Sequence, residues 1–335
     1  MTFRSLCAAA CLAWAAAAQA QPAAGIAELI ERSYREAFVP RAAAFAEASG
    51  QLSSAVGALC EAPADGAAAA LEAARAQWRN TTAAWDRLAG IAVGPVVKRR
   101  ALTALDFNPT RPATIERAIK TAPSTPEQME RIGTPAKGIP ALEWLLWSAS
   151  PAPAPQSPTC RYTQQVAQDL QREAAAIAEG FGTLAATDWK ADPERTNLAL
   201  QELINQWLGG VERLRWTQIE KPLKAAETSS GGKAPAFTRM ASGHTAQSWA
   251  AQGEALSELA PPVADALRAR GHGPLADRLA QSVTQAEPAM RAATPADAAG
   301  LGAAVRELGA LKKLIEAEVA PALDVTIGFS DGDGD

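Results

Sequence analysis

The stretch that decides the fold is Gly138-Ile139-Pro140-Ala141-Leu142-Glu143-Trp144-Leu145-Leu146-Trp147. Nearly every position in it is apolar, so the segment predicts a short helix that is buried on all sides. A single carboxylate, that of Glu143, lies inside this helix. Because a buried charge is costly unless it is paired or hydrogen-bonded, Glu143 needs a partner elsewhere in the chain.

The rest of the chain also carries a helical pattern. Alanine, the best helix former, dominates the composition, and no run alternates in the manner of a β-strand. Apolar residues recur at helical spacing in three stripes, over 200–214, 256–267 and 301–315. The pattern predicts an all-α protein with long helices over 25–59, 65–90, 159–186, 193–224, 239–268 and 296–320 and shorter ones over 112–120, 126–132, 140–148 and 274–291.

Loop-forming residues divide the helices into two groups. Residues 150–155 are rich in proline, residues 228–232 are rich in serine and glycine, and the stretch over 91–125 is irregular. We expect two four-helix-bundle-like domains, an N-terminal bundle over 21–187 that carries the 138–147 helix and a C-terminal bundle over 188–327. Residues 328–335 are typical of a polar tail.

The N-terminus predicts export. Arg4 precedes an apolar run over 6–18, and the small residues of Ala18-Gln19-Ala20 suit a cleavage site after Ala20, so residues 1–20 are predicted to be a signal peptide. A lipid-modified start at Cys11 is the alternative, but the residues before it lack the expected leucine. The apolar run is too short to span a bilayer, and no later stretch approaches that length without charges.

The charge of the chain argues against two classes of partner. The net charge is −4, and loss of Arg4 with the signal peptide makes it −5. A weakly acidic chain with dispersed charge and no basic stripe is not expected to bind nucleic acid or an anionic membrane surface.

Two cysteines, Cys60 and Cys160, remain after the predicted cleavage. In an exported protein two cysteines most simply form a disulfide, and only one pairing exists here. Two separate buried thiols are the alternative.

The small number of histidines limits the metal sites that the chain can form. His244 and His272 are the only histidines, so a zinc site made of histidines alone is excluded. His244 follows Ser242, which is suited to cap a helix, and it is either a ligand at a cleft or an ordinary surface group.

Glu143 is either a structural carboxylate paired with an arginine such as Arg79, Arg99 or Arg100, or a binding or metal-site group. The tryptophan pairs at 78 and 85 and at 144 and 147 share helix faces, as core residues or as an aromatic wall around a ligand.

The 138–147 segment resembles the motif of the imelysin family, Gly-x-His-x-x-Glu followed by an aromatic residue, two leucines and a tryptophan. Gly138 and Glu143 match the motif, whereas Pro140 stands at the histidine position. Four further segments are similar to the family in the same order along the chain: 78–95, 106–109, 239–249 and 319–333.

This resemblance implies an all-helical fold in the bacterial periplasm, a link to iron acquisition and a metallopeptidase assignment that rests on the His/Glu pair. It also implies that Asp106, Arg79 and Ser242 lie around an interdomain cleft. Only Glu143 of the metal pair is present, because the side chain of Pro140 cannot bind a metal.

Two functional hypotheses follow. The first is a periplasmic, non-catalytic protein that binds a ligand or partner in iron acquisition, with no cofactor or a weakly held metal ion. The second is a metal-dependent peptidase with ligands other than the family's, namely His244 with Glu143 and Asp106. A catalytic zinc usually has three protein ligands, which favours the first hypothesis. A scaffold that presents helices to an outer-membrane partner is a further possibility.

Overall fold

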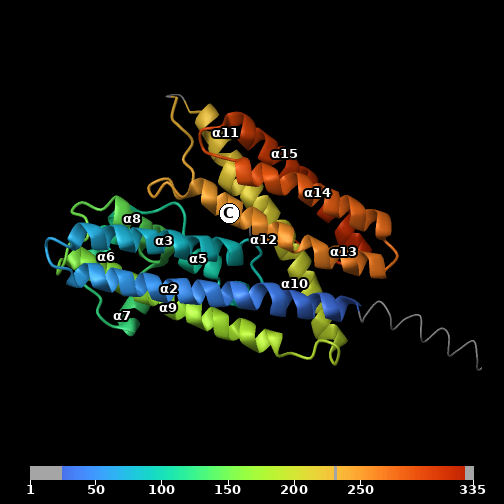
Figure 1. Ribbon diagram of the computed structural model, residues 1–335, viewed down its shortest axis with the longest axis horizontal. Coiled ribbons are helices and arrows are strands. Elements are labelled where there is room, and N and C mark those ends of the chain that lie inside the picture. The colour runs from blue at the N-terminus through green and yellow to red at the C-terminus, as the bar shows by residue number, and fades with distance from the viewer. Residues whose placement is uncertain (1–24, 230–231, 329–335) are drawn as a thin grey trace, which may run out of the picture.

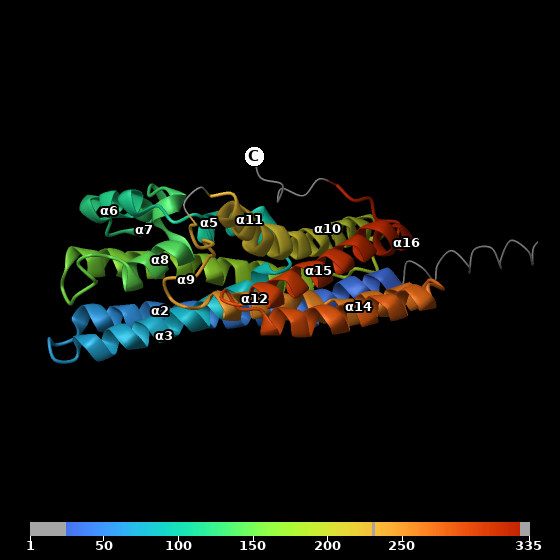
Figure 2. The same ribbon diagram turned by 90° about the horizontal axis from the view of Figure 1, so that it is seen from above.

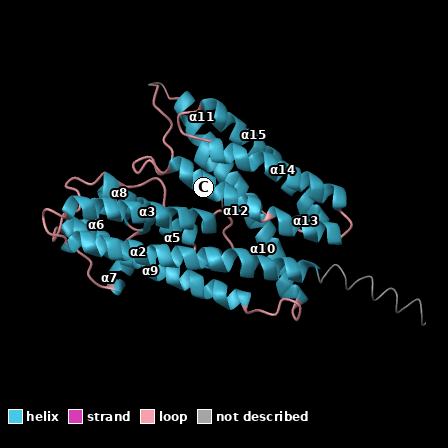
Figure 3. Cartoon of the chain, viewed as in Figure 1, coloured by secondary structure: helices cyan, strands magenta, loops and turns pink. Residues whose placement is uncertain are grey.

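The computed structural model describes residues 25–229 and 232–328. The predicted signal peptide and all but the first residue of the predicted tail lie outside these residues. Within the described ranges the chain is helical and has no strand (Figure 3). This confirms the predicted all-α class. None of the helices in these ranges combines the length and apolar character that crossing a membrane requires.

The first group of helices is built around a long antiparallel pair. A helical stretch over 25–32 leads through the π-helical turn η1 (Ser33–Phe38) into α2 (Val39–Glu61), and α3 (Ala67–Ala89) runs back along it. Short elements follow: α4 (Pro95–Lys98), α5 (Ala101–Leu105), α6 (Pro112–Thr121), α7 (Pro126–Glu130), η2 (Thr134–Ala136) and α8 (Gly138–Trp147). The long helix α9 (Pro158–Ala185) closes the group by packing against α2 and α8 (Figure 1).

The second group begins at α10 (Pro193–Glu212). Its other elements are η3 (Arg213–Glu220), α11 (Lys221–Glu227), α12 (Thr245–Glu258), α13 (Ala260–Ala269), α14 (Gly273–Ala292), α15 (Ala298–Leu314), η4 (Ile315–Val319) and α16 (Ala320–Ala322). Helix α14 packs against α12, α13 and α15, and α12 also packs against α3 of the first group (Figures 1 and 2). The contact between α3 and α12 therefore joins the two groups. The expected domain boundary near residue 188 stays a prediction.

One predicted long helix differs from the structure. The one expected over 239–268 starts only at Thr245 and breaks between α12 and α13, at Leu259. Arg239 and Gly243 have left-handed backbone, with φ of 63° and 69°, which a helix cannot continue through. Two successive prolines at 261 and 262 remove backbone donors just beyond the break. The helix predicted over 274–291 is confirmed as α14, which spans Gly273–Ala292.

Three prolines follow π-helical turns. Turn η1 ends two residues before Pro40, η3 two residues before Pro222 and η4 two residues before Pro321. Proline lacks the N–H that would bond four residues back, and its ring crowds that carbonyl group. A wider turn places the carbonyl differently, so the helix continues past each proline. At Pro40 the chain therefore changes helix type and does not leave the helix.

A disulfide between Cys60 and Cys160 confirms the predicted pairing. It joins the last turn of α2 to the first turn of α9, with 5.5 Å between the two Cα atoms and a sequence separation of 100. In the chain-entropy model, closing a loop of this length stabilises the folded state by restricting the unfolded chain.

Replacing both cysteines, Cys60→Ala with Cys160→Ala, should lower the free energy of unfolding by about 4 kcal/mol, because the unfolded chain regains its freedom. Urea unfolding of the mature protein measures this loss. Titration of the wild type in denaturant should find no free thiol before reduction. Two titratable thiols, or equal stability of the two proteins, would contradict the disulfide.

Candidate functional site

Helix α8 starts at a position that only glycine fits. Gly138 has a φ of +74°, and a Cβ built on it would lie 2.3 Å from the carbonyl oxygen of Leu105. The start of α8 is therefore packed directly on the end of α5. Pro140 lies in the first turn, where its missing N–H has no helical partner to lose, and it is buried.

Glu143 lies one turn further along α8 and is 7% exposed. Its Oε1 accepts two hydrogen bonds from Ser242, one from the backbone N–H at 2.9 Å and one from the hydroxyl at 2.7 Å. Ser242 belongs to the loop before α12, so these bonds connect the two groups of helices. They offset the cost of burying the carboxylate.

The structure does not contain the predicted ion pair between Glu143 and an arginine. Among the described residues Glu143 forms no ion pair. Arg79 instead donates from Nη2 to the carbonyl oxygen of Ser242 at 3.2 Å, and Arg99 pairs with Glu173. Arg79 therefore supports the same loop from its other side.

Arg239 is the buried cation of the site, with an exposed fraction of 4%. Its Nη2 donates to Oδ2 of Asp106 at 2.6 Å and lies 3.9 Å from Oδ1 of Asp86. The same oxygen of Asp106 accepts from Nε1 of Trp85 at 3.0 Å. The Nε and Nη1 atoms of Arg239 are buried without a hydrogen-bond partner.

Asp86 on α3 has an unusual environment for a carboxylate. It is 3% exposed and accepts from the Ser248 hydroxyl at 2.6 Å and from Nε2 of Gln252 at 3.4 Å. Burial raises the pKa of Asp86 to about 7, and the nearby charge of Arg239 opposes that rise. Asp86 therefore titrates near neutral pH.

His244 is buried, not a surface group, with an exposed fraction of 7%. Its ring lies edge-on to Trp78, with 6.1 Å between the ring centroids, and its Nε2 has no hydrogen-bond partner. Burial and, to a smaller extent, the charges of Arg239 and Arg79 together lower the pKa of His244 to about 4. The imidazole is therefore neutral at pH 7.

The tryptophans mainly act as packing residues, which is one of the two roles that the sequence allowed. Trp78 lies 5.1 Å from Trp147 between ring centroids and donates from Nε1 to the carbonyl oxygen of Ile139 at 3.1 Å. Arg79 covers the Trp147 ring, with 5.1 Å from its guanidinium carbon to the ring centroid. These contacts form one wall beside His244.

We call the six residues Asp86, Asp106, Glu143, Arg239, Ser242 and His244 the polar cluster. It lies where α3, α8 and the loop before α12 meet. The sequence singled out four of its members. Asp86 and Arg239 were missed, although Asp86 falls on the buried face of α3, eight residues after Trp78.

The donors of the polar cluster do not fit a catalytic metal. Among the residues that the structure describes, no three His, Cys, Asp or Glu side chains gather as a metal site would require. Of the set considered for a peptidase, Glu143 is bonded to Ser242 and Asp106 to Arg239 and Trp85.

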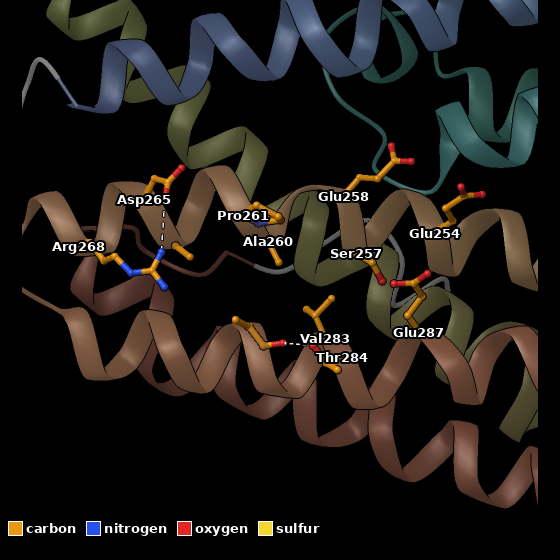
Figure 4. Close-up of a pocket in the computed structure, with 12 residues that line it drawn as sticks. Glu254, Ser257, Glu258, Ala260, Pro261, Asp265, Arg268, Val283, Thr284 and Glu287 are labelled. Carbon is orange, nitrogen blue, oxygen red and sulfur yellow. Dashed lines mark hydrogen bonds and ion pairs between the residues drawn. The ribbon is translucent and has the colours of Figure 1, made fainter.

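A hollow of about 470 Å³ between α12–α13 and α14 offers no alternative site (Figure 4). Its acidic side chains are already paired. Asp265 lies 3.3 Å from Arg268, Glu258 is paired with Arg41 and Arg87, and Glu287 with Arg291.

Gly138→Ala should destabilise the protein more than the same change at Gly243. Both positions have positive φ, which costs a residue with a side chain about 1–2 kcal/mol. Only at Gly138 does the new Cβ also collide with backbone, whereas at Gly243 nothing lies within 4 Å. Urea unfolding of the two variants compares the costs. Equal losses would contradict the close approach of α8 to Leu105.

The titration of Asp86 should make stability fall with rising pH. The folded chain keeps a proton on Asp86 between pH 3.8 and about 7 that the unfolded chain has lost, so the free energy of unfolding decreases across this range. Asp86→Asn should remove this decrease, and its stability relative to the wild type should therefore rise with pH. Urea unfolding of both proteins at several pH values gives the difference, in which the contribution of His244 largely cancels. A difference independent of pH would contradict the raised pKa.

Comparison with known proteins places this chain in a family. The imelysin family model matches residues 38–320. An imelysin-like protein from Psychrobacter arcticum 273-4 has a crystal structure similar to this chain, with a TM-score of 0.73 and 19% identity, over 92% of this chain and 98% of the other. A candidate iron-regulated protein A precursor from Parabacteroides distasonis ATCC 8503 is similar with a TM-score of 0.65 and 13% identity, over 89% and 95% of the two chains. No curated protein matches the chain. The match over most of the length shows that this chain belongs to the imelysin family.

Proposed function

We propose that this imelysin-family chain is a non-catalytic periplasmic protein that binds a ligand or partner in iron acquisition, and that the polar cluster is its binding site. The observation that carries the proposal is the pair of hydrogen bonds from Ser242 to Oε1 of Glu143. The carboxylate that the family motif provides for a metal is used here to fix a loop.

The chemistry of α8 argues against a metallopeptidase. Position 140 lies three residues before Glu143, so the two side chains project from the same side of the helix, as two ligands of one metal would. Proline at 140 has no donor atom. With no other His, Asp or Glu cluster among the described residues, the three ligands of a catalytic zinc are lacking.

Unpaired donors favour a binding role. Two nitrogens of Arg239, Nε and Nη1, and Nε2 of His244 are buried without a hydrogen-bond partner. A buried polar group without a hydrogen bond costs about 1–3 kcal/mol. A bound molecule with acceptor oxygens would satisfy the arginine and remove that cost. The interface between two groups of helices is a common place for such a site.

The cellular role rests on two further features. The N-terminal sequence predicts export with cleavage after Ala20. One structural neighbour is described as iron-regulated, which links the fold to iron conditions in that protein. We extend this context to the present chain as part of the proposal, with Gly138, Glu143, Asp106, Arg79, Ser242 and His244 as the residues that build or support the site.

Metal analysis of the purified mature protein tests the absence of a catalytic metal. After dialysis, the wild type should hold no stoichiometric zinc or iron. Pro140→His should raise zinc affinity, because it adds the imidazole three residues before Glu143, and Glu143→Ala in the same background should remove the gain. Stoichiometric metal in the wild type that is lost in Glu143→Ala would contradict the proposal.

A growth experiment tests the link to iron. Deletion of the gene in the source bacterium should slow growth under iron chelation and leave growth in iron-replete medium unchanged. The wild-type chain should restore growth, and Arg239→Ala, which removes the unpaired donors, should restore it less well. Equal growth of the deletion strain under both conditions would contradict a role in iron acquisition.

A further inference from the structure

The guanidinium group of Arg239 lies between two carboxylates and is hydrogen-bonded to only one of them. Its Nη2 donates to Oδ2 of Asp106 at 2.6 Å, whereas Oδ1 of Asp86 lies 3.9 Å away, beyond hydrogen-bond range. Within the described residues, Nε and Nη1 of Arg239 have no hydrogen-bond partner. Arg239 therefore has unused donors, and a movement of about 1 Å would bring it into contact with Asp86.

Asp106 has other partners that can stabilise its charge. Its side chain is 19% exposed, and it accepts hydrogen bonds from Nε1 of Trp85 and Nδ2 of Asn108, both at 3.0 Å. These contacts do not depend on Arg239. Asp106 can therefore stay ionised when the arginine moves away.

Asp86 lacks such support. Its side chain is 4% exposed, and among the described residues it accepts hydrogen bonds only from the uncharged side chains of Ser248 and Gln252 on α12. A carboxylate that is shielded from water in this way needs a nearby cation to stabilise its charge. The ionised form of Asp86 therefore favours a closer contact with Arg239.

Three charged groups from other elements face Asp86. Arg239 comes from the loop before α12, Asp106 follows α5, and Arg213 belongs to η3. Nη2 of Arg213 is bound to backbone carbonyl groups at the C-terminal end of α3, at 2.6 Å and 3.2 Å. Burial, with a smaller contribution from the charge of Asp106, raises the pKa of Asp86 to about 7 against the opposing effect of the two arginines. Asp86 therefore gains or loses its charge close to neutral pH.

We propose that Arg239 is a pH-dependent switch between these two carboxylates. When Asp86 is protonated, Arg239 pairs with Asp106 alone. When Asp86 is ionised, its charge draws the guanidinium group toward Asp86 and away from Asp106.

The switch acts on the loop that builds the polar cluster. The carbonyl oxygen of Arg239 accepts from the backbone N–H of His244 and from the hydroxyl of Ser242, both at 3.0 Å. The same hydroxyl donates to Glu143. Arg239 also has left-handed backbone, a conformation that a residue with a side chain keeps only where its surroundings hold it there. A change of partner at the guanidinium group therefore bears directly on Ser242 and His244.

A role of the switch in regulating ligand binding rests on the proposed function of the polar cluster. An Arg239 side chain that is held by ionised Asp86 is less available to a ligand with acceptor oxygens. Binding at the cluster should therefore weaken as the pH rises through 7. The switch itself needs no ligand and can be tested on the protein alone.

Crystal structures of the mature wild type without ligand, at about pH 5.5 and about pH 8.5, test the switch on either side of the titration of Asp86. At the lower pH, Arg239 should be bound to Asp106. At the higher pH, the shortest distance from the guanidinium nitrogens to the carboxylate of Asp86 should fall from 3.9 Å to about 3 Å. The distance from these nitrogens to Asp106 should increase to more than about 3.5 Å.

Two variants identify the group that drives the movement. Asp86→Asn cannot ionise, so its Arg239 should stay on Asp106 at both pH values. Asp169→Asn is the matched control, because Asp169 lies on α9 and pairs with Lys137 and Arg172. Its Arg239 should move as in the wild type.

Arg239 bound to Asp106 and more than about 3.5 Å from Asp86 at both pH values in the wild type would overturn the proposal. The same movement in Asp86→Asn would also overturn it, because another group would then drive the change. If Asp86→Asn does not fold, the two wild-type structures decide. Normal growth of the deletion strain under iron chelation would contradict the proposed function and leave the switch intact, so the two proposals fail separately.

Discussion

The site depends on one contact between α8 and the loop before α12. The backbone N–H and the hydroxyl of Ser242 both donate hydrogen bonds to Oε1 of Glu143. It joins residues 99 positions apart and fixes the loop before α12 against α8. That loop then holds Arg239 between two aspartates and His244 against Trp78. The motif carboxylate therefore has a structural use that is independent of a metal. The carboxylate therefore keeps a role in the fold although proline stands at the histidine position of the motif.

Much of the fold could be predicted because its signals are local. Thr125, Ser157 and Asp192 each accept a backbone N–H from three residues further along the chain, and each is followed directly by a proline in the first turn of its helix. Asp297 caps α15 in the same way, by accepting from the backbone N–H groups of Ala299 and Gly300. The π-helical turns and the break in α12 could not be predicted from periodicity, since they depend on how a helix accommodates proline within a packed bundle.

The site was harder to predict because its contacts are not local. Glu143 could be recognised, because one carboxylate in an apolar helix is conspicuous, but Ser242 could not be identified as its partner. Arg239 appears in sequence as an ordinary charged residue near a turn, and Asp86 as one more acid on a helix. Only tertiary packing brings them together and removes water, which moves the pKa values of Asp86 and His244 in opposite directions.

The disulfide has a consequence for the durability of the protein. Residues 60 to 160 form a closed covalent ring that contains α3 and α8, and with them Asp86, Asp106 and Glu143. The irregular connections of this ring are where a protease would cut. A single cut there opens the ring but releases no fragment, because both new ends stay attached through sulfur. The segments that build the cluster can therefore return to their places after cleavage.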